Sequence, residues 1–299
     1  MSARLVSSIG DSLQLPPGHR FPAGKYERIV ETVVARHPDL VVESTRVPWQ
    51  DLGLCHAASY IAGVRSGELP AAMVRAIGLP WSESMVARSR RSVGGTVSAL
   101  DWAMREGAAG HLAGGTHHAF ADRGAGFCVF NDIAVAIHVA RRDHGVERAS
   151  VIDLDVHQGD GTAALFADDP RVFTLSLHGE KNFPFRKQQG SLDVALPDGC
   201  ADIEYLRALD VALEQVAPHR PEVLFYQAGV DPLAGDRFGR LALTHDGLRA
   251  RDARVFALAR RLGVPLVVTL GGGYHPDIES TIAAHVAVFE GLVEAYRRS

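Results

Sequence analysis

The feature that most constrains this chain is an alternation between short apolar runs and longer segments of helical periodicity. The short runs are rich in β-branched residues and apolar on both faces, as strands buried in a parallel sheet are. This alternation predicts a single α/β domain over residues 1–299, with a mostly parallel central sheet and helices on both of its faces. The expected strands cover residues 149–154, 172–177, 223–227 and 264–270, and the expected helices cover 25–37, 82–106, 130–144, 201–217, 244–262 and 278–297.

The composition fits a globular domain and excludes several other classes of protein. Of the 299 residues, 46% are hydrophobic and 22% are charged, which is ordinary for a globular chain. The net charge of −4 argues against a dedicated nucleic-acid binder, because such proteins usually carry a basic excess. No apolar run approaches the ~20 residues that span a bilayer, so we expect no membrane partner.

Cysteines and basic residues add little chemistry of their own. The cysteines lie far apart, without disulfide or zinc-finger spacing, which favours a reducing, cytoplasmic setting. We expect Cys128 to be a small buried residue rather than a nucleophile. Arg88, Arg90 and Arg91 are expected to lie on a solvated face of the 82–106 helix rather than to contact nucleic acid.

Ionisable side chains collect where the predicted strands end. Open α/β sheets bind their ligands at the carboxyl ends of the strands, so this edge is where a site is expected. The residues at these ends are Asp153, Asp155, His157, Ser176, His178, Asp231 and Tyr274.

Asp155, His157 and Asp231 form a candidate metal site. Alternate residues of an extended chain share a face, so Asp155 and His157 point the same way and can bind one divalent cation. Asp231 supplies a third ligand, and catalytic zinc typically has three protein ligands and one open position. Fe²⁺ remains an alternative to Zn²⁺ for such ligands. The alternative for each aspartate is an ordinary turn residue after a strand.

His117 and His118 follow two glycines and are candidates for acid–base chemistry. A neutral histidine beside a metal-bound water is a natural general base. Asp153 and Asp160 remain available to fix the tautomers of the two rings. Adjacent histidines are also common as surface residues, so the pair alone does not decide the function.

Tyr274 follows three glycines at the end of the 264–270 run. These glycines do not form a dinucleotide-binding fingerprint, because position 276 is a proline. A phenol at this place could donate a hydrogen bond to a developing oxyanion. A simple tight turn is the alternative reading of the glycines.

These motifs together resemble the zinc-dependent histone deacetylase family, which has the arginase-like α/β fold. The resemblance runs from about residue 16 to residue 284 and is closest to the class IV branch and to bacterial histone deacetylase-like amidohydrolases. The motifs, in the order of the family, are PPGHRFPAGKY, GGTHHAFADRGAGFCVFND, DLDVHQGDGTA, AGVDPLAGDRFGRL and GGGYHPD.

The resemblance implies a role for each candidate residue. It makes His118 the general base, His117 its electrostatic partner and Tyr274 the group that polarises the scissile carbonyl. It makes Asp153 and Asp160 the acids that orient the histidines. It further implies zinc ligands at Asp155, His157 and Asp231, tunnel walls at Gly126, Phe127 and Phe183, and a monovalent-cation site, usually potassium (K⁺), at Asp153 and Ser176.

The function implied is a metal-dependent amidohydrolase that removes acetyl or other acyl groups from lysine side chains of a protein or peptide. An acetylpolyamine or other small acylated amine is the alternative substrate. Phe238 stands where polyamine-selective members have a glutamate, which argues against that alternative. A two-manganese ureohydrolase and a non-catalytic acyl-lysine binding module are further alternatives.

Two segments depart from the family pattern. The opening segment LVSSIGDSLQL lacks the usual His-Pro and aromatic residues, and the IGLPW loop lacks the acidic residue that holds the substrate backbone in several relatives. We therefore expect one rim of the tunnel, and the anchoring of a peptide, to differ from those relatives.

Overall fold

A central sheet of eight parallel strands organises the computed structural model, which describes residues 2–11 and 13–297. Ser12, in the opening segment noted above, lies outside the described residues. The order across the sheet is β2-β1-β3-β8-β7-β4-β5-β6, and each neighbouring pair runs parallel. The strands are β1 (Ser2–Ser7), β2 (Val41–Glu43), β3 (Gly107–His111), β4 (Ala149–Asp153), β5 (Val172–Gly179), β6 (Leu192–Leu196), β7 (Val223–Gln227) and β8 (Leu266–Thr269).

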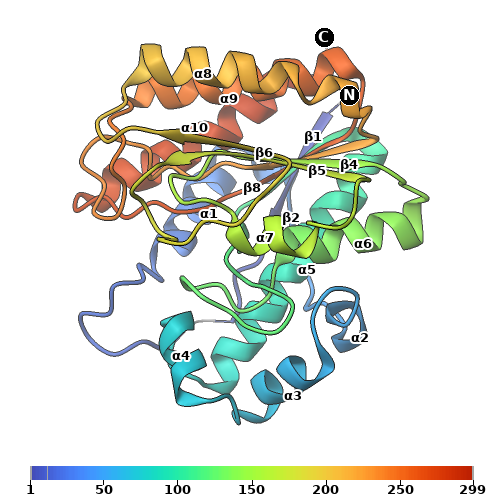
Figure 1. Cartoon of the computed structure of the whole chain (residues 1–299), viewed down its shortest axis with the longest axis vertical. Helices are drawn as coiled ribbons and strands as arrows, with labels where there is room; N and C mark the ends of the chain where they lie inside the picture. Colours follow the sequence, from blue (N-terminus) through green and yellow to red (C-terminus); the bar gives the residue numbers. More distant parts are fainter. Residues whose placement is uncertain (1, 12, 298–299) are drawn as a thin grey trace.

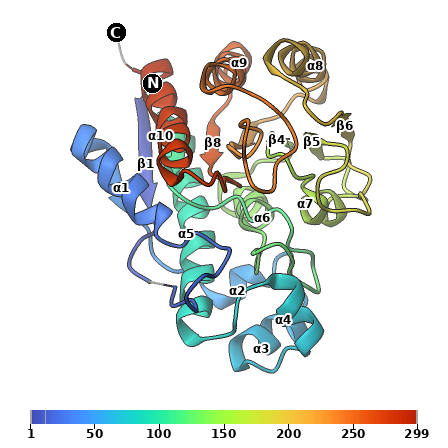
Figure 2. The same cartoon turned by 90° about the vertical axis from the view of Figure 1, so that its left-hand side faces the viewer.

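Helices cover both faces of this sheet (Figure 1). In Figure 2, α8, α9 and α10 lie in one row, and α5 runs from the sheet down to α2, α3 and α4. No helix in the described part of the chain is both long and apolar enough to cross a membrane. The helices are α1 (Lys25–Arg36), α2 (Trp49–Leu52), α3 (Ala58–Ser66), α4 (Ala71–Ile77), α5 (Glu83–Glu106), α6 (Asp132–His144), α7 (Asp160–Leu165), α8 (Asp202–Glu214), α9 (His245–Leu262) and α10 (Ile278–Ala295), with short 3₁₀ turns at Pro38–Leu40 and Ala217–His219.

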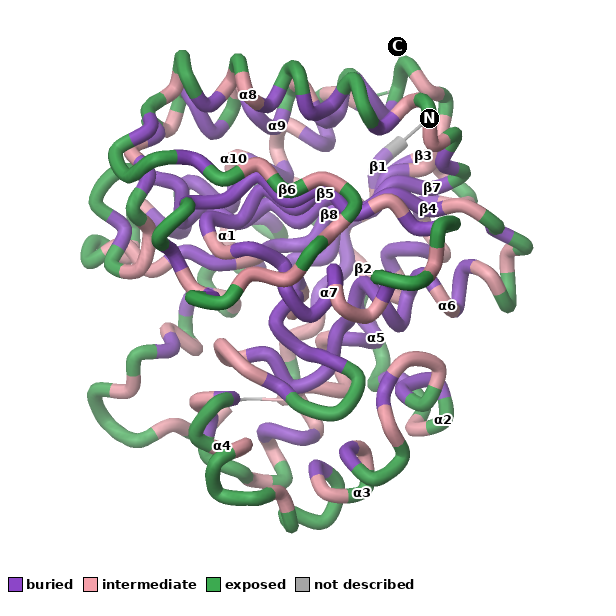
Figure 3. The backbone as a smooth tube through the Cα atoms, viewed as in Figure 1, coloured by how far each residue is buried: buried purple, intermediate pink, exposed green. Residues whose placement is uncertain are grey.

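The strands are buried on both faces, and alternate residues enter two different cores. Val151 and Phe225 pack in the core that includes α5 and α6, whereas Ile152 and Tyr226 pack in the core that includes α8, α9 and α10. Figure 3 shows the strands as a buried layer between partly exposed helices. This two-sided burial is the physical reason for runs that are apolar throughout.

All the strands and helices expected from the sequence are present, and several of the expected boundaries hold. Ser82 caps α5 by accepting a hydrogen bond from Met85 N at 3.0 Å. Gly107 and Gly145 end α5 and α6 in the left-handed conformation, which glycine adopts without steric cost. The α/β class with a parallel sheet is therefore confirmed, and the sheet is parallel throughout.

The additional strands β1, β2, β3 and β6 lack a strong sequence signal. β3 has the sequence GAAGH, whose small residues have little intrinsic preference for a strand. Small residues are needed in β3 for packing, because a Cβ on Gly110 would lie 2.7 Å from the Phe289 ring. β6 is an edge strand with only Leu196 buried, so its apolar pattern is weak.

The prediction that Arg88, Arg90 and Arg91 lie on a solvated helix face is wrong. All three are half-buried, because the segments before α1 and around α2 pack over this side of α5. Their guanidinium groups have specific partners: Arg88 lies over the rings of Phe21 and Tyr26, Arg90 donates to Val47 O, and Arg91 bonds Asp11 and Ser44 O.

Close packing of α5 predicts the outcome of a glycine substitution. Alanine is preferred to glycine in a helix by about 1 kcal/mol, but a Cβ on Gly94 would lie 2.0 Å from Thr45 O, which is backbone. We expect Gly94→Ala to lower the free energy of unfolding by about 1–3 kcal/mol, measured by urea denaturation. The matched control is Gly291→Ala in α10, where the nearest atom is in the movable Phe256 ring at 3.2 Å. An equal effect of the two substitutions would contradict this account.

Candidate active site

The candidate site lies where four neighbouring strands end. β3, β8, β7 and β4 are adjacent in the sheet, and the loop that follows each one reaches the same place. A cavity of about 1070 Å³ opens there. Its lining includes the predicted site residues His117, His118, Asp155, His157 and Tyr274.

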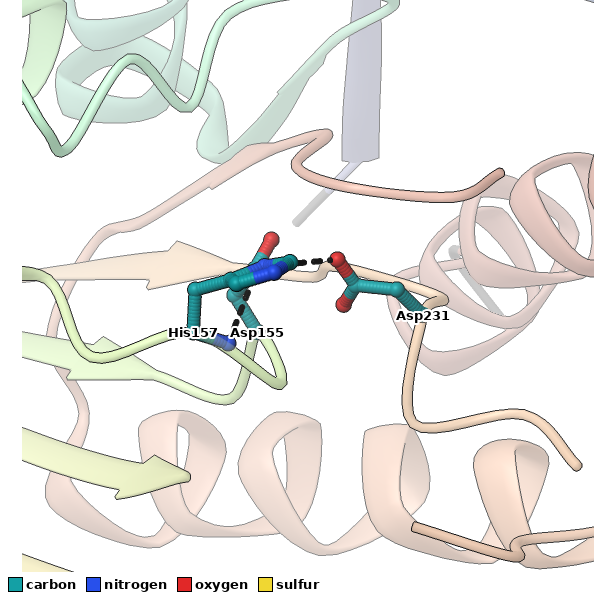
Figure 4. Close-up of side chains that lie close together, drawn as sticks. All are labelled: Asp155, His157 and Asp231. Atoms are coloured by element: carbon teal, nitrogen blue, oxygen red, sulfur yellow. Dashed lines mark hydrogen bonds and ion pairs between the residues drawn. The ribbon is translucent and has the colours of Figure 1, made fainter. Parts of the chain in front are cut away.

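Asp155, His157 and Asp231 come together as the sequence predicted, although Asp231 lies far along the chain (Figure 4). One ligand atom from each lies within 4.8 Å of the others. His157 Nδ1 is 2.9 Å from Asp155 Oδ1 and 3.1 Å from Asp231 Oδ2. Among the described residues this is the one group of three such side chains with the spacing of a metal site.

Backbone amides hold the two carboxylates in place. Gly272 N donates to Asp155 Oδ2 at 2.6 Å, and Val156 N donates to Asp231 Oδ1 at 2.9 Å. The second bond joins the ends of the adjacent strands β4 and β7, and the first joins the ends of β8 and β4 across β7, so the sheet itself sets the separation of the two carboxylates. A Cβ on Gly272 would lie 1.7 Å from Asp231 Oδ2, so this turn requires glycine.

The residues present fit a divalent cation. Asp231 Oδ2 is buried and accepts no well-aligned hydrogen bond, since its one close polar neighbour is His157 Nδ1 at 3.1 Å, itself a candidate ligand. Burial, followed by the charge of Asp155, raises the pKa of Asp231 to about 7, because two carboxylates share one dry site. A bound cation would relieve this repulsion and would satisfy Asp231 Oδ2. Two carboxylates and one imidazole are ligands that Zn²⁺ accepts.

The two adjacent histidines each have one carboxylate partner. His117 Nδ1 lies 2.7 Å from Asp153 Oδ2, and His118 Nδ1 lies 2.6 Å from Asp160 Oδ1. All four side chains are buried. Each carboxylate accepts the Nδ1 proton of its histidine, so Nε2 of His118 is left to act toward the cavity.

The two histidines differ in protonation. Burial, reinforced by the neighbouring charge of His117, lowers the pKa of His118 to about 4 despite its bond to Asp160. Burial acts in the same direction on His117, but the carboxylates of Asp153 and Asp155 outweigh it and raise the pKa to about 9. His118 is therefore neutral at pH 7 and can accept a proton, as its predicted role requires.

Asp132, for which sequence reasoning assigned no role, anchors the histidine loop. Its carboxylate accepts hydrogen bonds from Gly115 N at 2.9 Å and from Thr116 N at 2.7 Å. It also accepts from the hydroxyls of Thr116 and Thr96. These four bonds fix the turn immediately before the histidines. The signal was the Asn-Asp pair that closes the motif GGTHHAFADRGAGFCVFND, at the start of α6.

Tyr274 is held at the cavity by its backbone and by its ring. Its N–H donates to Asp236 Oδ2 at 2.6 Å, and Phe238 packs edge-on against its ring with centroids 5.0 Å apart. Burial raises the pKa of the phenol well above its ordinary value, so the hydroxyl keeps its proton and can donate it in a hydrogen bond.

Aromatic side chains form the walls expected at Phe127 and Phe183. Phe183 packs edge-on against His118 with centroids 4.9 Å apart, while Phe127 lies 6.2 Å from Tyr274 and 5.3 Å from Phe21. Phe127 has φ of 67°, which is unusual for a bulky residue. Its N–H donates to Ile77 O at 2.7 Å, so the end of α4 helps to hold this conformation.

Asp153 and Ser176, the predicted monovalent-cation ligands, face each other across β4 and β5. Both line a second, small cavity of about 10 Å³, which is room for about one water-sized particle. Asp153 already bonds His117, and Ser176 Oγ bonds His178 Nδ1 at 3.0 Å.

Two buried cations beside the site were not expected from the sequence. Lys25 is 1% exposed, and its Nζ lies 3.3 Å from Gly273 O and 5.2 Å from the centre of the Tyr274 ring. Arg251 is fully buried and donates to Gly229 O at 2.5 Å and to Leu154 O at 3.2 Å. Both donate to backbone carbonyls of the loops that carry the candidate residues, so they help to hold these loops in place.

Comparison with known proteins decides the family. Residues 19–289 match the histone deacetylase domain. The chain belongs to the histone deacetylase family.

Relatives and solved structures agree with this assignment. The chain is 39% identical to an uncharacterized protein of Picosynechococcus over 94% of this chain and 95% of the relative. It is 34% identical to Histone deacetylase 2 of Arabidopsis thaliana over 92% of this chain and 75% of the relative. The crystal structure of an HDAC homolog complexed with SAHA superimposes with a TM-score of 0.85 at 29% identity, covering 100% of this chain and 85% of that one.

Histone deacetylase family members are hydrolases that use a metal ion. If the Asp155–His157–Asp231 cluster binds it, Asp231→Ala should remove most of the bound metal, since it deletes one of three protein ligands. Metal stoichiometry of the purified protein, measured by mass spectrometry after exposure to Zn²⁺, checks this. Asp210→Ala, a carboxylate on the surface of α8, is the control and should retain full metal. Full metal in Asp231→Ala would refute the ligand assignment.

Proposed function

We propose that this protein is a metal-dependent deacylase that hydrolyses acetyl or other acyl groups from lysine side chains of proteins or peptides. The observation that carries the proposal is that one aromatic-walled cavity is lined by Asp155 and His157 of the Asp155–His157–Asp231 cluster, by His118, which Asp160 holds from behind the cavity wall, and by Tyr274. Residues 1–299 act as a single catalytic domain in this proposal.

Asp155, His157 and Asp231 hold the metal, for which Zn²⁺ is proposed and Fe²⁺ is the alternative. When bound, the metal polarises the substrate carbonyl and lowers the pKa of water at its open position. We also assign the small cavity beside Asp153 and Ser176 to a monovalent cation such as K⁺.

His118 accepts the proton of the attacking water through Nε2, because Asp160 occupies Nδ1. Asp153 holds His117 in the same way, and burial together with the charge of His117 lowers the pKa of His118, which keeps it neutral and ready to accept. Tyr274 donates a hydrogen bond to the carbonyl oxygen as negative charge develops on it. A histidine of the pair then returns a proton to the leaving amine.

The walls of the cavity favour a lysine side chain. Phe127, Phe183 and Gly126 line the cavity in front of the histidines and would enclose the apolar stem of the lysine. A Cβ on Gly126 would lie 2.5 Å from the His118 ring. Only glycine therefore lets the backbone pass this close to the proposed general base. Phe238 adds another ring rather than a carboxylate, which supports acyl-lysine over acetylpolyamine.

The proposal is tested by a panel of substrates. Acetyl-lysine peptides should be hydrolysed with a higher kcat/KM than acetylpolyamines, and longer acyl groups can be ranked in the same assay. Preferential hydrolysis of acetylpolyamines would favour the small-amine alternative. Binding of acetyl-lysine peptides without release of acetate would favour a non-catalytic binding module.

His118→Ala should reduce kcat far more than Cys128→Ser. A general base contributes roughly 10²–10⁴-fold to the rate, whereas burial raises the pKa of the Cys128 thiol well above its ordinary value and leaves it unreactive. Both proteins should retain the metal, because neither residue belongs to the Asp155–His157–Asp231 cluster. The opposite order of activities would point to thiol chemistry.

Tyr274→Phe should reduce kcat by roughly 10²–10³-fold, equivalent to about 3–4 kcal/mol, with unchanged metal content. The substitution removes one hydroxyl and keeps the ring that packs against Phe238. A donor that acts mainly in the transition state affects kcat more than substrate binding. A kcat within a few-fold of the parent would remove Tyr274 from the catalytic residues.

A further inference from the structure

We propose that the mouth of the active-site cavity selects acyl-lysines that lie in acidic segments of a protein substrate. This inference rests on the proposed deacylase function and names its substrate class more closely. It comes from the charges around the mouth, where the cavity lining includes five exposed cationic side chains: Arg20, Arg75, Lys181, Arg237 and Arg240.

These cations come from separate segments and surround the aromatic walls. Arg20 immediately precedes Phe21, which packs against Phe127, and Arg237 immediately precedes Phe238, which packs against Tyr274. Arg75 precedes Ala76, whose carbonyl accepts a hydrogen bond from Gly126 N at 3.0 Å. Lys181 lies two residues before Phe183. The positive charges of the lining therefore come from four separate segments of the chain, each next to a residue that forms or supports an aromatic wall.

Few carboxylates neutralise these five positive charges. Arg240 and Lys181 share one partner, Asp198, at 3.2 and 3.8 Å. Within the described part of the chain, Arg20, Arg75 and Arg237 have no ion-pair partner.

The acids that line the same cavity leave the mouth positive. Asp11 is bound by Arg46 and Arg91, Asp155 belongs to the metal cluster, and Glu27 is the remaining one. The mouth is therefore positive on a chain whose net charge is −4.

An acyl-lysine is neutral, so the charges of a substrate that interact with the mouth are those of the residues that flank the acyl-lysine. Cations around a cleft attract acidic flanking residues and repel basic ones, and the effect weakens with salt because the screening length is about 8 Å at physiological ionic strength. A protonated polyamine and a lysine-rich tail are repelled for the same reason. Phe185 is 86% exposed and packs edge-on against Phe183, which offers an apolar contact to one flanking side chain.

The test uses three acetyl-lysine peptides of equal length whose flanking residues are glutamate, serine or lysine. At low salt, kcat/KM should be at least about tenfold higher for the glutamate peptide than for the lysine peptide, and added salt should reduce this ratio. Equal values for the three peptides, or a preference for the lysine peptide, would overturn the inference while leaving the deacylase function intact. No turnover of any of them, the serine peptide included, would overturn the proposed function and this inference with it.

Charge-reversal variants test whether the cationic residues at the mouth cause the preference for acidic flanking residues. Arg237→Glu and Arg20→Glu should each lower the ratio between the glutamate and lysine peptides several-fold, mainly through KM. Arg207→Glu, on the exposed surface of α8 and absent from the cavity lining, makes the same change in net charge and should leave the ratio unchanged. An equal change in all three variants would show that the preference comes from net charge rather than from the mouth, which would overturn the assignment.

Discussion

The repulsion between the buried carboxylates of Asp155 and Asp231 is the interaction around which this molecule is arranged. Both are almost completely buried, and their separation is set by backbone amides at the ends of β4 and β8. Such a pair is unfavourable in a dry interior unless a cation lies between them. The fold thus brings these side chains together through the sheet, and a bound cation would recover the free energy of bringing them together.

The sequence predicts where the candidate residues lie because they sit at the ends of strongly apolar strands. Asp155 and His157 follow β4 directly, and Asp231 follows β7 after a short turn. The apolar pattern does not contain the order of the strands, which places β8 between β3 and β7 and so brings Tyr274 close to the histidine loop. The residues were identified from local patterns and from the family resemblance, whereas their roles remain predictions that the variants will test.

The residues that the sequence did not reveal act through backbone contacts made far along the chain. Lys25 binds a carbonyl of the glycine turn before Tyr274, and Arg251 binds carbonyls next to the metal cluster. A lysine or arginine in a helix is usually solvated, so neither pattern signals burial. The prediction that Arg88 lies on a solvated face failed for the same reason, because the aromatic rings that cover it come from the segment around α1.

The left-handed backbone of Phe127 puts stability and selectivity in opposition at a single position. A bulky residue with φ of 67° is strained by about 1–3 kcal/mol, and glycine would relieve that strain. Glycine would also remove one aromatic side chain from the lining of the cavity. A variant chosen only for thermal stability is therefore expected to drift toward a smaller residue here and to accept bulkier or less apolar side chains. If the proposed function holds, the aromatic wall that limits substrate scope at this position is kept at a cost in backbone strain.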